Sequence, residues 1–327
     1  MLNFALLQKL NINLDLATEA HSLLRGTKNL EIPGVKETVE NKKNLKITNI
    51  SILDNEGAKI MGRPQGEYIT IDVPLLLTSE ENSETIHKET ATAIGELLKN
   101  LIPMGNAPIL ICGLGNPHIS SDALGPKVIK SSMATRHLFL YMAEHMEAGF
   151  SDVALIAPNV MGNTGIETVE IIESIAKEIK AKAVIVIDAL AAASFKRVGS
   201  SFQIANTGIT PGAGVGNTRK AINEETLGIP VIAIGVPTVV LLSTVMGEAI
   251  LAAANTMQNK NNADSFNEES AADIIEKLLS EHHDNFAVTP KDIDELIQKL
   301  SNIIIAGLHI ALHAKLNINN YHEYLNL

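Results

Sequence analysis

Short runs of apolar, β-branched residues alternate with longer segments in which apolar residues recur every three or four positions. The short runs predict buried strands, and the longer segments predict amphipathic helices. The predicted strands cover residues 45–53, 68–73, 109–112, 153–157, 183–187, 202–205 and 231–236. The predicted helices cover residues 82–101, 166–179, 239–254 and about 292–316. This alternation indicates an α/β fold: a mostly parallel, twisted sheet flanked by helices, with a β-rich N-terminal part and a long C-terminal helix.

The chain reads as one large domain of 327 residues, without internal repeats. A turn is expected at residues 54–57, where Asp, Asn, Glu and Gly follow one another. Residues 257–271 are polar, rich in Asn and without periodicity. This composition predicts a mobile surface loop.

Composition narrows the classes of function. Hydrophobic residues make up 46% of the chain but aromatic residues only 3%, so the core is aliphatic. The single cysteine, Cys112, excludes internal disulfides and a cysteine-based metal cluster, and its place in an apolar run makes it a core residue. A net charge of −11 argues against direct binding of nucleic acid. No apolar run reaches the roughly 20 residues of a membrane span, and no secretory leader is evident, so we expect a soluble, cytoplasmic protein.

The richest stretch for chemistry is residues 107–126. The apolar run at 109–112 is followed by Gly113 and Gly115, which permit a tight turn or a close approach of another backbone. Residues 120–122 suit helix N-caps, and Pro126 suits an early position of the helix that follows. Asp122 is therefore expected at the carboxyl end of a parallel strand, where open α/β sheets place their sites.

A second acid, Asp188, directly follows the apolar run at 183–187 and precedes an alanine-rich turn at 189–193. Taken singly, Asp122 suits a helix cap and Asp188 a loop anchor. Because parallel strands end at one edge of a sheet, however, we expect the two carboxylates to meet there. Such a pair holds one proton near neutral pH. One member then activates water while the other protonates a leaving amine or polarises a carbonyl.

Other chemical signals are weaker. Gly113 and Gly115 begin a dinucleotide fingerprint, but His118 occupies the third glycine position. The glycine-rich loop at 208–217 lacks the Gly-Lys-Ser/Thr ending of a P-loop, and we interpret it as a structural or substrate-binding loop. His309 and His313 have metal-ligand spacing but lack the adjacent Glu and a third ligand, so we interpret them as helix-face residues. No metal and no cofactor are predicted.

Several blocks, in order, resemble the germination protease family of endospore-forming bacteria. They lie at residues 113–116, 122–126, 160–168, 187–192, 211–217 and 226–240, and the resemblance extends from about residue 15 to residue 313. It implies an aspartic-type endopeptidase of the spore core that degrades small acid-soluble, DNA-coating spore proteins during germination. It also implies a zymogen and a homotetramer. The family's catalytic aspartates match Asp122 and Asp188.

The resemblance further implies a propeptide. Substrates of the family are cut after an acid that is followed by a large apolar residue, Ala, any residue and Glu. Residues 15–19, DLATE, fit this pattern. We therefore expect cleavage between Asp15 and Leu16, with residues 1–15 as propeptide and residues 16–327 as a single α/β peptidase domain.

Substrate binding is expected at seven further positions: Gly113, Gly115, Asn116, Gly212, Gly214, Gly216 and Asn217. The chain departs from the usual family pattern at Pro117, Ser121, Ala193, Asn206, Thr210 and Leu241. These departures bear on specificity and on the tuning of the aspartate pair, whereas both aspartates are kept. Two alternatives remain open: a hydrogenase-maturation peptidase, which has a similar strand, Gly-x-Gly-Asn and Asp layout, and a non-catalytic binding paralogue.

Overall fold

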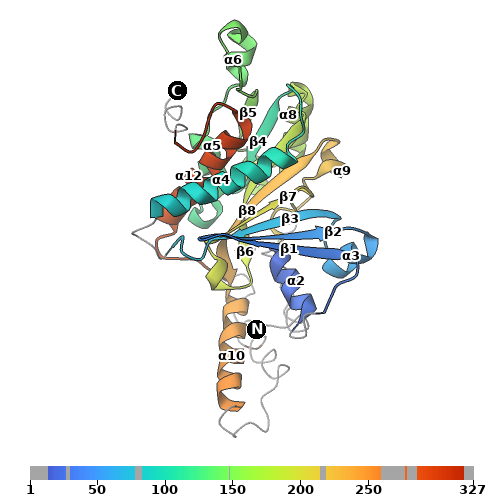
Figure 1. The fold of residues 1–327 in the computed structure, drawn as a ribbon, viewed down its shortest axis with the longest axis vertical. Helices are drawn as coiled ribbons and strands as arrows, with labels where there is room; N and C mark the ends of the chain where they lie inside the picture. The colour runs from blue at the N-terminus through green and yellow to red at the C-terminus, as the bar shows by residue number, and fades with distance from the viewer. Residues whose placement is uncertain are drawn as a thin grey trace.

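The computed structural model describes residues 14–26, 30–77, 83–146, 148–213, 219–258, 277 and 286–319. Within these residues, nine strands form one sheet in the order β1-β2-β3-β7-β8-β6-β4-β5, with β9 beside β8 (Figure 1). The strands are β1 (Val35–Asn41), β2 (Lys46–Ile52), β3 (Gly66–Asp72), β4 (Ile109–Gly113), β5 (Val153–Ile156), β6 (Ala183–Ala192), β7 (Ser201–Ala205), β8 (Val231–Leu241) and β9 (Ala287–Val288).

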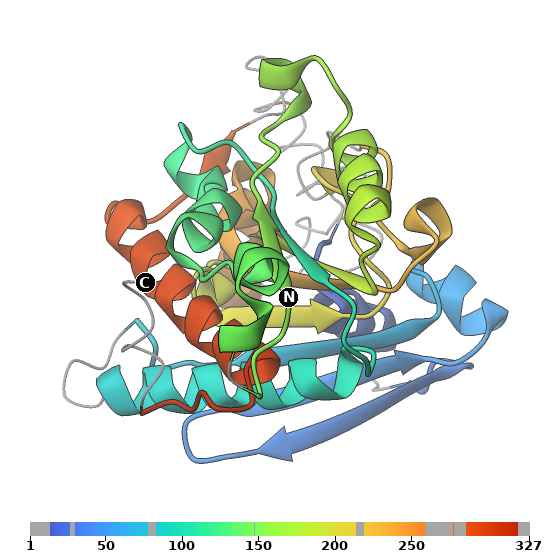
Figure 2. The same cartoon turned by 90° about the horizontal axis from the view of Figure 1, so that it is seen from above.

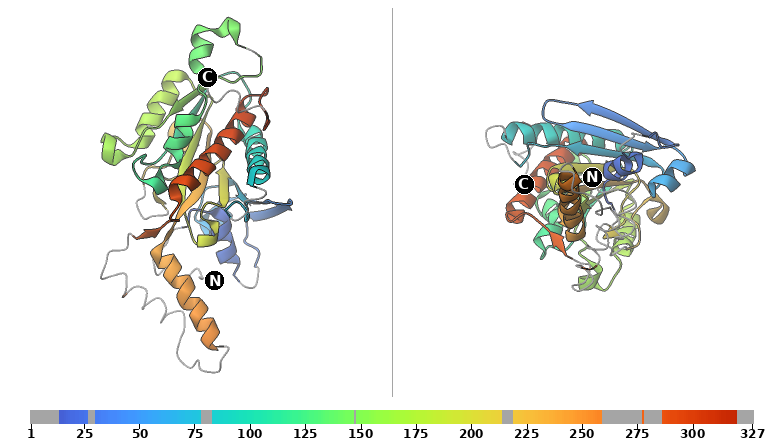
Figure 3. Two further views of the ribbon diagram at one scale, coloured as in Figure 1. Left: turned by 90° about the vertical axis from the view of Figure 1, so that its left-hand side faces the viewer. Right: turned by 90° about the horizontal axis from the view of Figure 1, so that it is seen from below.

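Helices flank this sheet. They are α2 (Ala17–Arg25), α3 (Asn55–Met61), α4 (Ser83–Leu101), α5 (Leu124–Ser131), α6 (Arg136–Tyr141), α7 (Met161–Thr164), α8 (Thr168–Ile179), α9 (Glu224–Leu227), α10 (Leu242–Gln258) and α12 (Ile293–Leu312), with a 3₁₀ turn, η1 (Ser120–Asp122), before α5. Figure 3 shows α10 extending away from the sheet at the end of β8.

The sheet is mixed. Strands β5, β4, β6 and β8 run parallel, while the N-terminal strands β1, β2 and β3 form an antiparallel meander that joins them through β7. The α/β fold, the β-rich N-terminal part and the long C-terminal helix are confirmed.

Alternate residues of the central strands explain their continuous apolar runs. Ile109 and Ile111 of β4 face a core that α4, α5 and α12 cover, whereas Leu110 and Cys112 face a core that α8 and α9 cover (Figure 2). Successive side chains of a strand point to opposite faces, so a strand buried on both sides is apolar at every position. α2 packs separately on β2 and β3, where Ile50, Ile52 and Tyr68 are buried.

Three local predictions from the sequence are wrong. Residues 54–57 do not form a turn, because the Asp54 side chain accepts the Gly57 N–H at 2.8 Å and caps α3. The alanine-rich stretch at 189–193 is not a turn either, since β6 continues through Asp188 to Ala192 beside β8. Nor does the strand predicted at residues 231–236 end before Pro237: β8 continues to Leu241. The register shifts next to the pairing of Pro237 with Leu190, and such a bulge accommodates the missing N–H of proline.

Two predicted segments fall largely outside the described residues. Of the propeptide, residues 1–13 lie outside them, and only residues 14 and 15 are described. Of the loop expected at 257–271, residues 257 and 258 end α10, and the rest lie outside.

Among the described residues, α12 is the one helix long and apolar enough to cross a membrane. However, 72% of its most apolar 18-residue window is buried inside the protein. Its apolar character is therefore that of a core helix, which packs against α4 (Figure 2).

We predict that Gly307→Ala destabilises this helix pair. An added Cβ at Gly307 would lie 2.6 Å from Ile94 Cγ2 and 3.1 Å from the Ala91 carbonyl oxygen. Overpacking of this kind costs about 1–3 kcal/mol, more than the roughly 1 kcal/mol that Ala gains over Gly in a helix. Urea unfolding measures the difference. Gly162→Ala is the control, because no heavy atom lies within 4 Å of its added Cβ; equal stability of the two variants would contradict the prediction.

Candidate active site

Asp122 lies in η1, in the connection between β4 and α5. It is not the N-cap of α5, since that helix begins at Leu124 with Ala123 as its N-cap. Its carboxylate Oδ2 instead accepts the backbone N–H of Asn116 at 2.7 Å. The side chain is thus tied to the loop that leaves β4 and not to the helix that follows.

Glycines make this arrangement possible. Gly115 has φ +108°, and a Cβ there would lie 2.0 Å from the carbonyl oxygen of Asp122. A Cβ at Gly113 would lie 2.2 Å from the carbonyl oxygen of Gly125. Because no other residue fits at these contacts, the glycines let η1 and α5 pack directly on the end of β4.

Asp188 lies inside β6, opposite Gly235 of β8. Its side chain is buried, and one carboxylate oxygen accepts the backbone N–H of Ala189 at 2.9 Å. Burial, followed by the nearby carboxylates of Asp122 and Asp15, raises the pKa of Asp188 well above its usual value. Burial also raises the pKa of Asp122, and the hydrogen bond from Asn116 partly offsets this effect.

The two aspartates line one cavity of about 290 Å³, together with Asp15. The structure therefore brings together the pair that the sequence singled out. Asp188 reaches the cavity from within a strand, not from the strand end that we expected. Asp188 is more deeply buried than Asp122, so we expect Asp188 to have the higher pKa. Asp188 is then the carboxyl that keeps a proton, and Asp122 ionises first.

The carboxylate of Asp15 binds the far end of β6. β4 pairs with β6 only as far as Ile187, so no strand of the described part of the chain lies beside the rest of β6 on that side. There the backbone N–H of Ala191 donates to Asp15 Oδ2 at 2.8 Å. An acidic side chain thus takes the place of a neighbouring strand.

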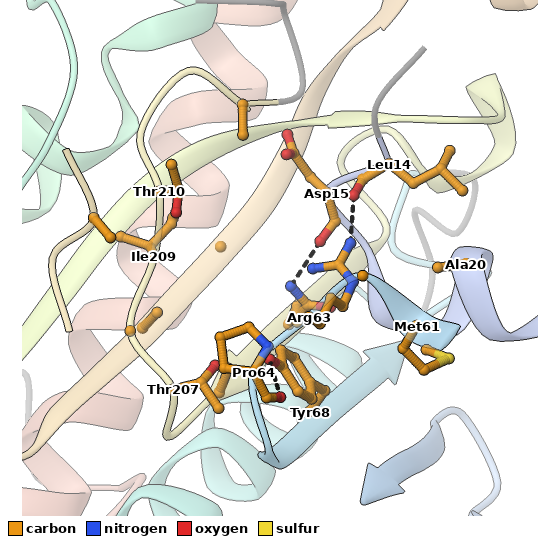
Figure 4. Close-up of a pocket in the computed structure, with 18 of the residues that line it drawn as sticks. Leu14, Asp15, Ala20, Met61, Arg63, Pro64, Tyr68, Thr207, Ile209 and Thr210 are labelled. Atoms are coloured by element: carbon orange, nitrogen blue, oxygen red, sulfur yellow. Dashed lines mark hydrogen bonds between the residues drawn. The ribbon is translucent and has the colours of Figure 1, made fainter. Parts of the chain in front are cut away.

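Polar side chains from β3 and β7 and their flanks hold the backbone of the same segment (Figure 4). The guanidinium of Arg63 donates to the Leu14 carbonyl oxygen. The side-chain amide of Gln203 donates to the Asp15 carbonyl oxygen at 3.1 Å and accepts the Ala17 N–H at 2.7 Å. The side chain of Leu16, between them, is fully buried. The peptide bond at which we expect cleavage is therefore fixed on both sides.

Glu19, four residues after Asp15, is held in the same way. Its carboxylate accepts the Ala193 N–H, at 3.1 and 3.0 Å to its two oxygens, and lies 3.5 Å from Nε of Arg197. Arg197 also contacts Asp72 at 2.7 Å. Burial raises the pKa of Glu19 to about 7, a larger effect than the opposing ones of Ala193 and Arg197.

Asp15 also lines a larger cavity of about 790 Å³ (Figure 4). Asp15, Leu190 and Thr210 line both cavities. Arg63, Tyr68 and Gln203 line only the larger one. The aspartate pair therefore lines one of the two cavities, and the groups that bind the backbone of this segment line the other.

The predicted substrate-binding residues do not all line these two cavities. Gly115 and Gly212 line the smaller cavity, whereas Gly113 packs against Gly125, and the N–H of Asn116 is used by Asp122. Gly214, Gly216 and Asn217 lie outside the described residues. Among the departures from the family pattern, Ser121 and Thr210 line the smaller cavity, and Ala193 binds Glu19 through its backbone.

Sequence reasoning missed Arg63, Arg197 and Gln203. Gln203 left one usable signal, because it is the polar position in the otherwise apolar predicted strand at residues 202–205. Arg63 and Arg197 left none, since Arg63 follows α3, Arg197 ends a 3₁₀ turn (Phe195–Arg197), and each meets its partner only through the tertiary fold.

His309 and His313 are structural. His309 Nε2 accepts the Met133 N–H, and His313 Nδ1 accepts the Ser151 N–H, each at 3.2 Å. Burial lowers the pKa of His309 to about 4 and that of His313 to about 3. These neutral rings attach two loops to α12. Within the described part of the chain, no three His, Cys, Asp or Glu side chains are grouped to hold a metal ion.

Comparison with known proteins gives a consistent family. The model of the family described as germination protease matches residues 13–265 and 262–325. Germination proteases of Clostridium perfringens (strain 13 / Type A) and Clostridium tetani are 40% and 39% identical, each over 97% of this chain and 99% and 100% of theirs. That of Bacillus cereus (strain AH187) is 36% identical over 97% of this chain and 98% of its own.

A solved structure, the [NiFe] hydrogenase maturation protease HycI from Thermococcus kodakarensis KOD1, is 17% identical, with a TM-score of 0.33 over 65% of this chain and 98% of that chain. A similarity this low supports neither a shared fold nor a shared function.

We predict that Glu19 makes the stability of the full chain depend on pH. Because its pKa of about 7 in the folded protein lies above the ordinary value of 4.5, its contribution to stability is complete below pH 4.5 and is lost as pH rises through 7. At pH 8, Glu19→Gln should be more stable than its parent by up to about 3 kcal/mol, and at pH 4.5 the two should be similar. Denaturant unfolding measures this, in an Asp122→Asn background because Asp122 is one of the two predicted catalytic aspartates; a difference that does not vary with pH would contradict it.

Proposed function

This chain belongs to the germination protease family, and on that premise we propose that it is an aspartic-type endopeptidase that cleaves small acid-soluble, DNA-binding spore proteins during germination. In this proposal it is made as a zymogen with residues 1–15 as propeptide, assembles as a homotetramer and acts in the spore core. The observation that carries the proposal is the position of Asp15, which lines the cavity of Asp122 and Asp188 immediately before the bond to be cut.

The aspartate pair supplies the chemistry. Asp122, the carboxylate, takes a proton from a water molecule whose oxygen attacks the carbonyl carbon of Asp15. Asp188, which burial keeps protonated, gives its proton to the nitrogen of Leu16 as the C–N bond breaks. The products are a carboxylic acid at Asp15 and an amine at Leu16. Transfer of the proton from Asp122 back to Asp188 through solvent restores the pair.

The N-terminal segment serves as a model for a separate substrate. The Asp15 carboxylate, the buried Leu16 and Ala17 side chains and the Glu19 carboxylate each have a defined partner or pocket. A spore protein with an acid, a large apolar residue, Ala and Glu at the same spacing would make the same contacts. The family assignment supports this substrate class over hydrogenase maturation.

Our first functional prediction is self-cleavage of the full chain between Asp15 and Leu16. Asp15 already lines the cavity of the aspartate pair, so incubation under mildly acidic, dehydrating conditions, in which Asp188 stays protonated, should permit the reaction. N-terminal sequencing of the incubated protein should give Leu16 as the new first residue.

Asp122→Asn and Asp188→Asn should both abolish this cut, because each removes one of the two proton-transfer groups. Asp294→Asn, an exposed aspartate of α12, is the matched control and should be cut like the wild type. A cut at another bond, or an Asp122→Asn protein cut at the same bond, would disprove the mechanism.

A second functional prediction concerns cleavage in trans. Processed protein mixed with a small acid-soluble spore protein should produce fragments that begin directly after an acid, as mass spectrometry would detect. Processed Asp188→Asn is not obtainable by self-cleavage, so residues 16–327 with and without this substitution should be compared. Absence of fragments with the unsubstituted protein would favour the non-catalytic binding paralogue.

A further inference from the structure

Gln203 is a polar residue in a strand whose other described positions are apolar or small. All five residues of β7 are buried, and the side chain of Gln203 is 9% exposed. A buried side-chain amide without hydrogen-bond partners would lower the stability of the fold by about 1–3 kcal/mol, so we expect Gln203 to have partners that explain its presence. Both of its hydrogen-bond partners, the Asp15 carbonyl oxygen and the Ala17 N–H, belong to the segment at the aspartate pair.

These two partners fix how the amide is oriented. The Ala17 N–H needs an acceptor, which only Oε1 supplies, and the Asp15 carbonyl needs a donor, which only Nε2 supplies. Rotating the amide by 180° would place Oε1 against the Asp15 carbonyl oxygen and Nε2 against the Ala17 N–H, and both contacts would be repulsive. The donor of Gln203 therefore points at the carbonyl oxygen of the bond between Asp15 and Leu16.

Hydrolysis of that bond places a negative charge on this same oxygen when water attacks. We propose that Gln203 is a further catalytic residue, whose Nε2 donates to the oxygen of the Asp15 carbonyl and stabilises the oxyanion. The inference rests on the proposed function. Donors that are already in place where charge develops are effective because they need not reorganise during the reaction.

The position of Gln203 suits this role in two ways. β7 pairs with β3 on one side and β8 on the other, so its backbone is fixed, and Gly235 opposite Gln203 has no side chain to displace the amide. The amide is also neutral. A cation in its place would lower the pKa of the nearby aspartates and remove the proton that Asp188 must supply.

The test is the first-order rate of self-cleavage of the full chain in Gln203→Glu and Gln203→Met, measured against pH and divided by the wild-type rate at the same pH. Gln203→Met removes the donor at every pH and should slow cleavage by roughly 10²- to 10³-fold throughout. Gln203→Glu should show the same loss only at pH values high enough to ionise the introduced carboxyl. As pH falls, the carboxyl introduced by Gln203→Glu gains an O–H that donates to the carbonyl, so its relative rate should recover. Gln203→Met should not recover at any pH.

A second readout separates catalysis from docking. The Glu side chain still accepts the Ala17 N–H, so hydrogen exchange of that amide should stay as slow in Gln203→Glu as in the uncleaved Asp122→Asn protein. Gln298→Glu, an exposed position of α12, is the matched control and should be cut at the wild-type rate.

Cleavage of Gln203→Met at the wild-type rate would overturn the inference, because that variant has no donor at any pH. So would an equal, pH-independent loss in both variants with faster exchange at Ala17, because Gln203 would then only hold the segment. If the wild-type chain itself is not cut between Asp15 and Leu16, the proposed function fails first, which distinguishes the two failures.

Discussion

The candidate site depends on a difference in length between two neighbouring strands. β4 ends at Gly113, opposite Ile187, whereas β6 continues beside β8 to Ala192. Backbone amides on the uncovered side of β6 need acceptors, because a buried N–H without one costs free energy. Ala191 and Ala193 obtain theirs from the carboxylates of Asp15 and Glu19. The spacing between Asp15 and Glu19 thus lets their two carboxylates bind two amides on the same edge of β6.

The same geometry explains why the carboxyls at this edge hold protons. Helices and strands cover both faces of the sheet, so Asp188 and Glu19 are removed from water, and burial is the largest influence on the pKa of each. The close approach of the Asp122 and Asp15 carboxylates raises the pKa of Asp188 further. The glycine contacts at Gly115 and Gly125 permit that approach. The tight backbone packing therefore buries these carboxyls and brings them close together, and both effects favour their protonated forms.

The sequence predicted the layers well because burial on two faces leaves unbroken apolar runs, and Ile109–Gly113 and Ser83–Leu101 agree with the expected strand and helix within one residue. Patterns failed where a tertiary partner replaced a local rule. The alanine-rich residues 189–193 are typical of a turn, but residues 189–192 pair with β8 in the fold. Residues 120–122 are typical of helix caps, but the Asp122 carboxylate accepts the Asn116 N–H instead. The aspartate pair could be predicted from the ends of two apolar runs, because parallel strands end at one edge of a sheet. The partners of residues 15–19 could not, because Gln203 and Arg197 lie far from them in the sequence.

The contacts of the N-terminal segment have a consequence for any second substrate. Cutting after Asp15 would free residues 1–15, but it would not free α2, because Ala17 and Ala20 pack into the core with Tyr68 and Glu19 remains bonded to Ala193. A separate peptide that uses the same contacts can enter only after residues 16–19 leave them. Ionisation of Glu19 opposes its burial, so a rise in pH through about 7 weakens the hold of α2 on β6. In the proposed function, protonated Glu19 therefore favours docking of the N-terminal segment for self-cleavage. Loss of the same proton favours release of residues 16–19, which makes their binding site accessible to another chain.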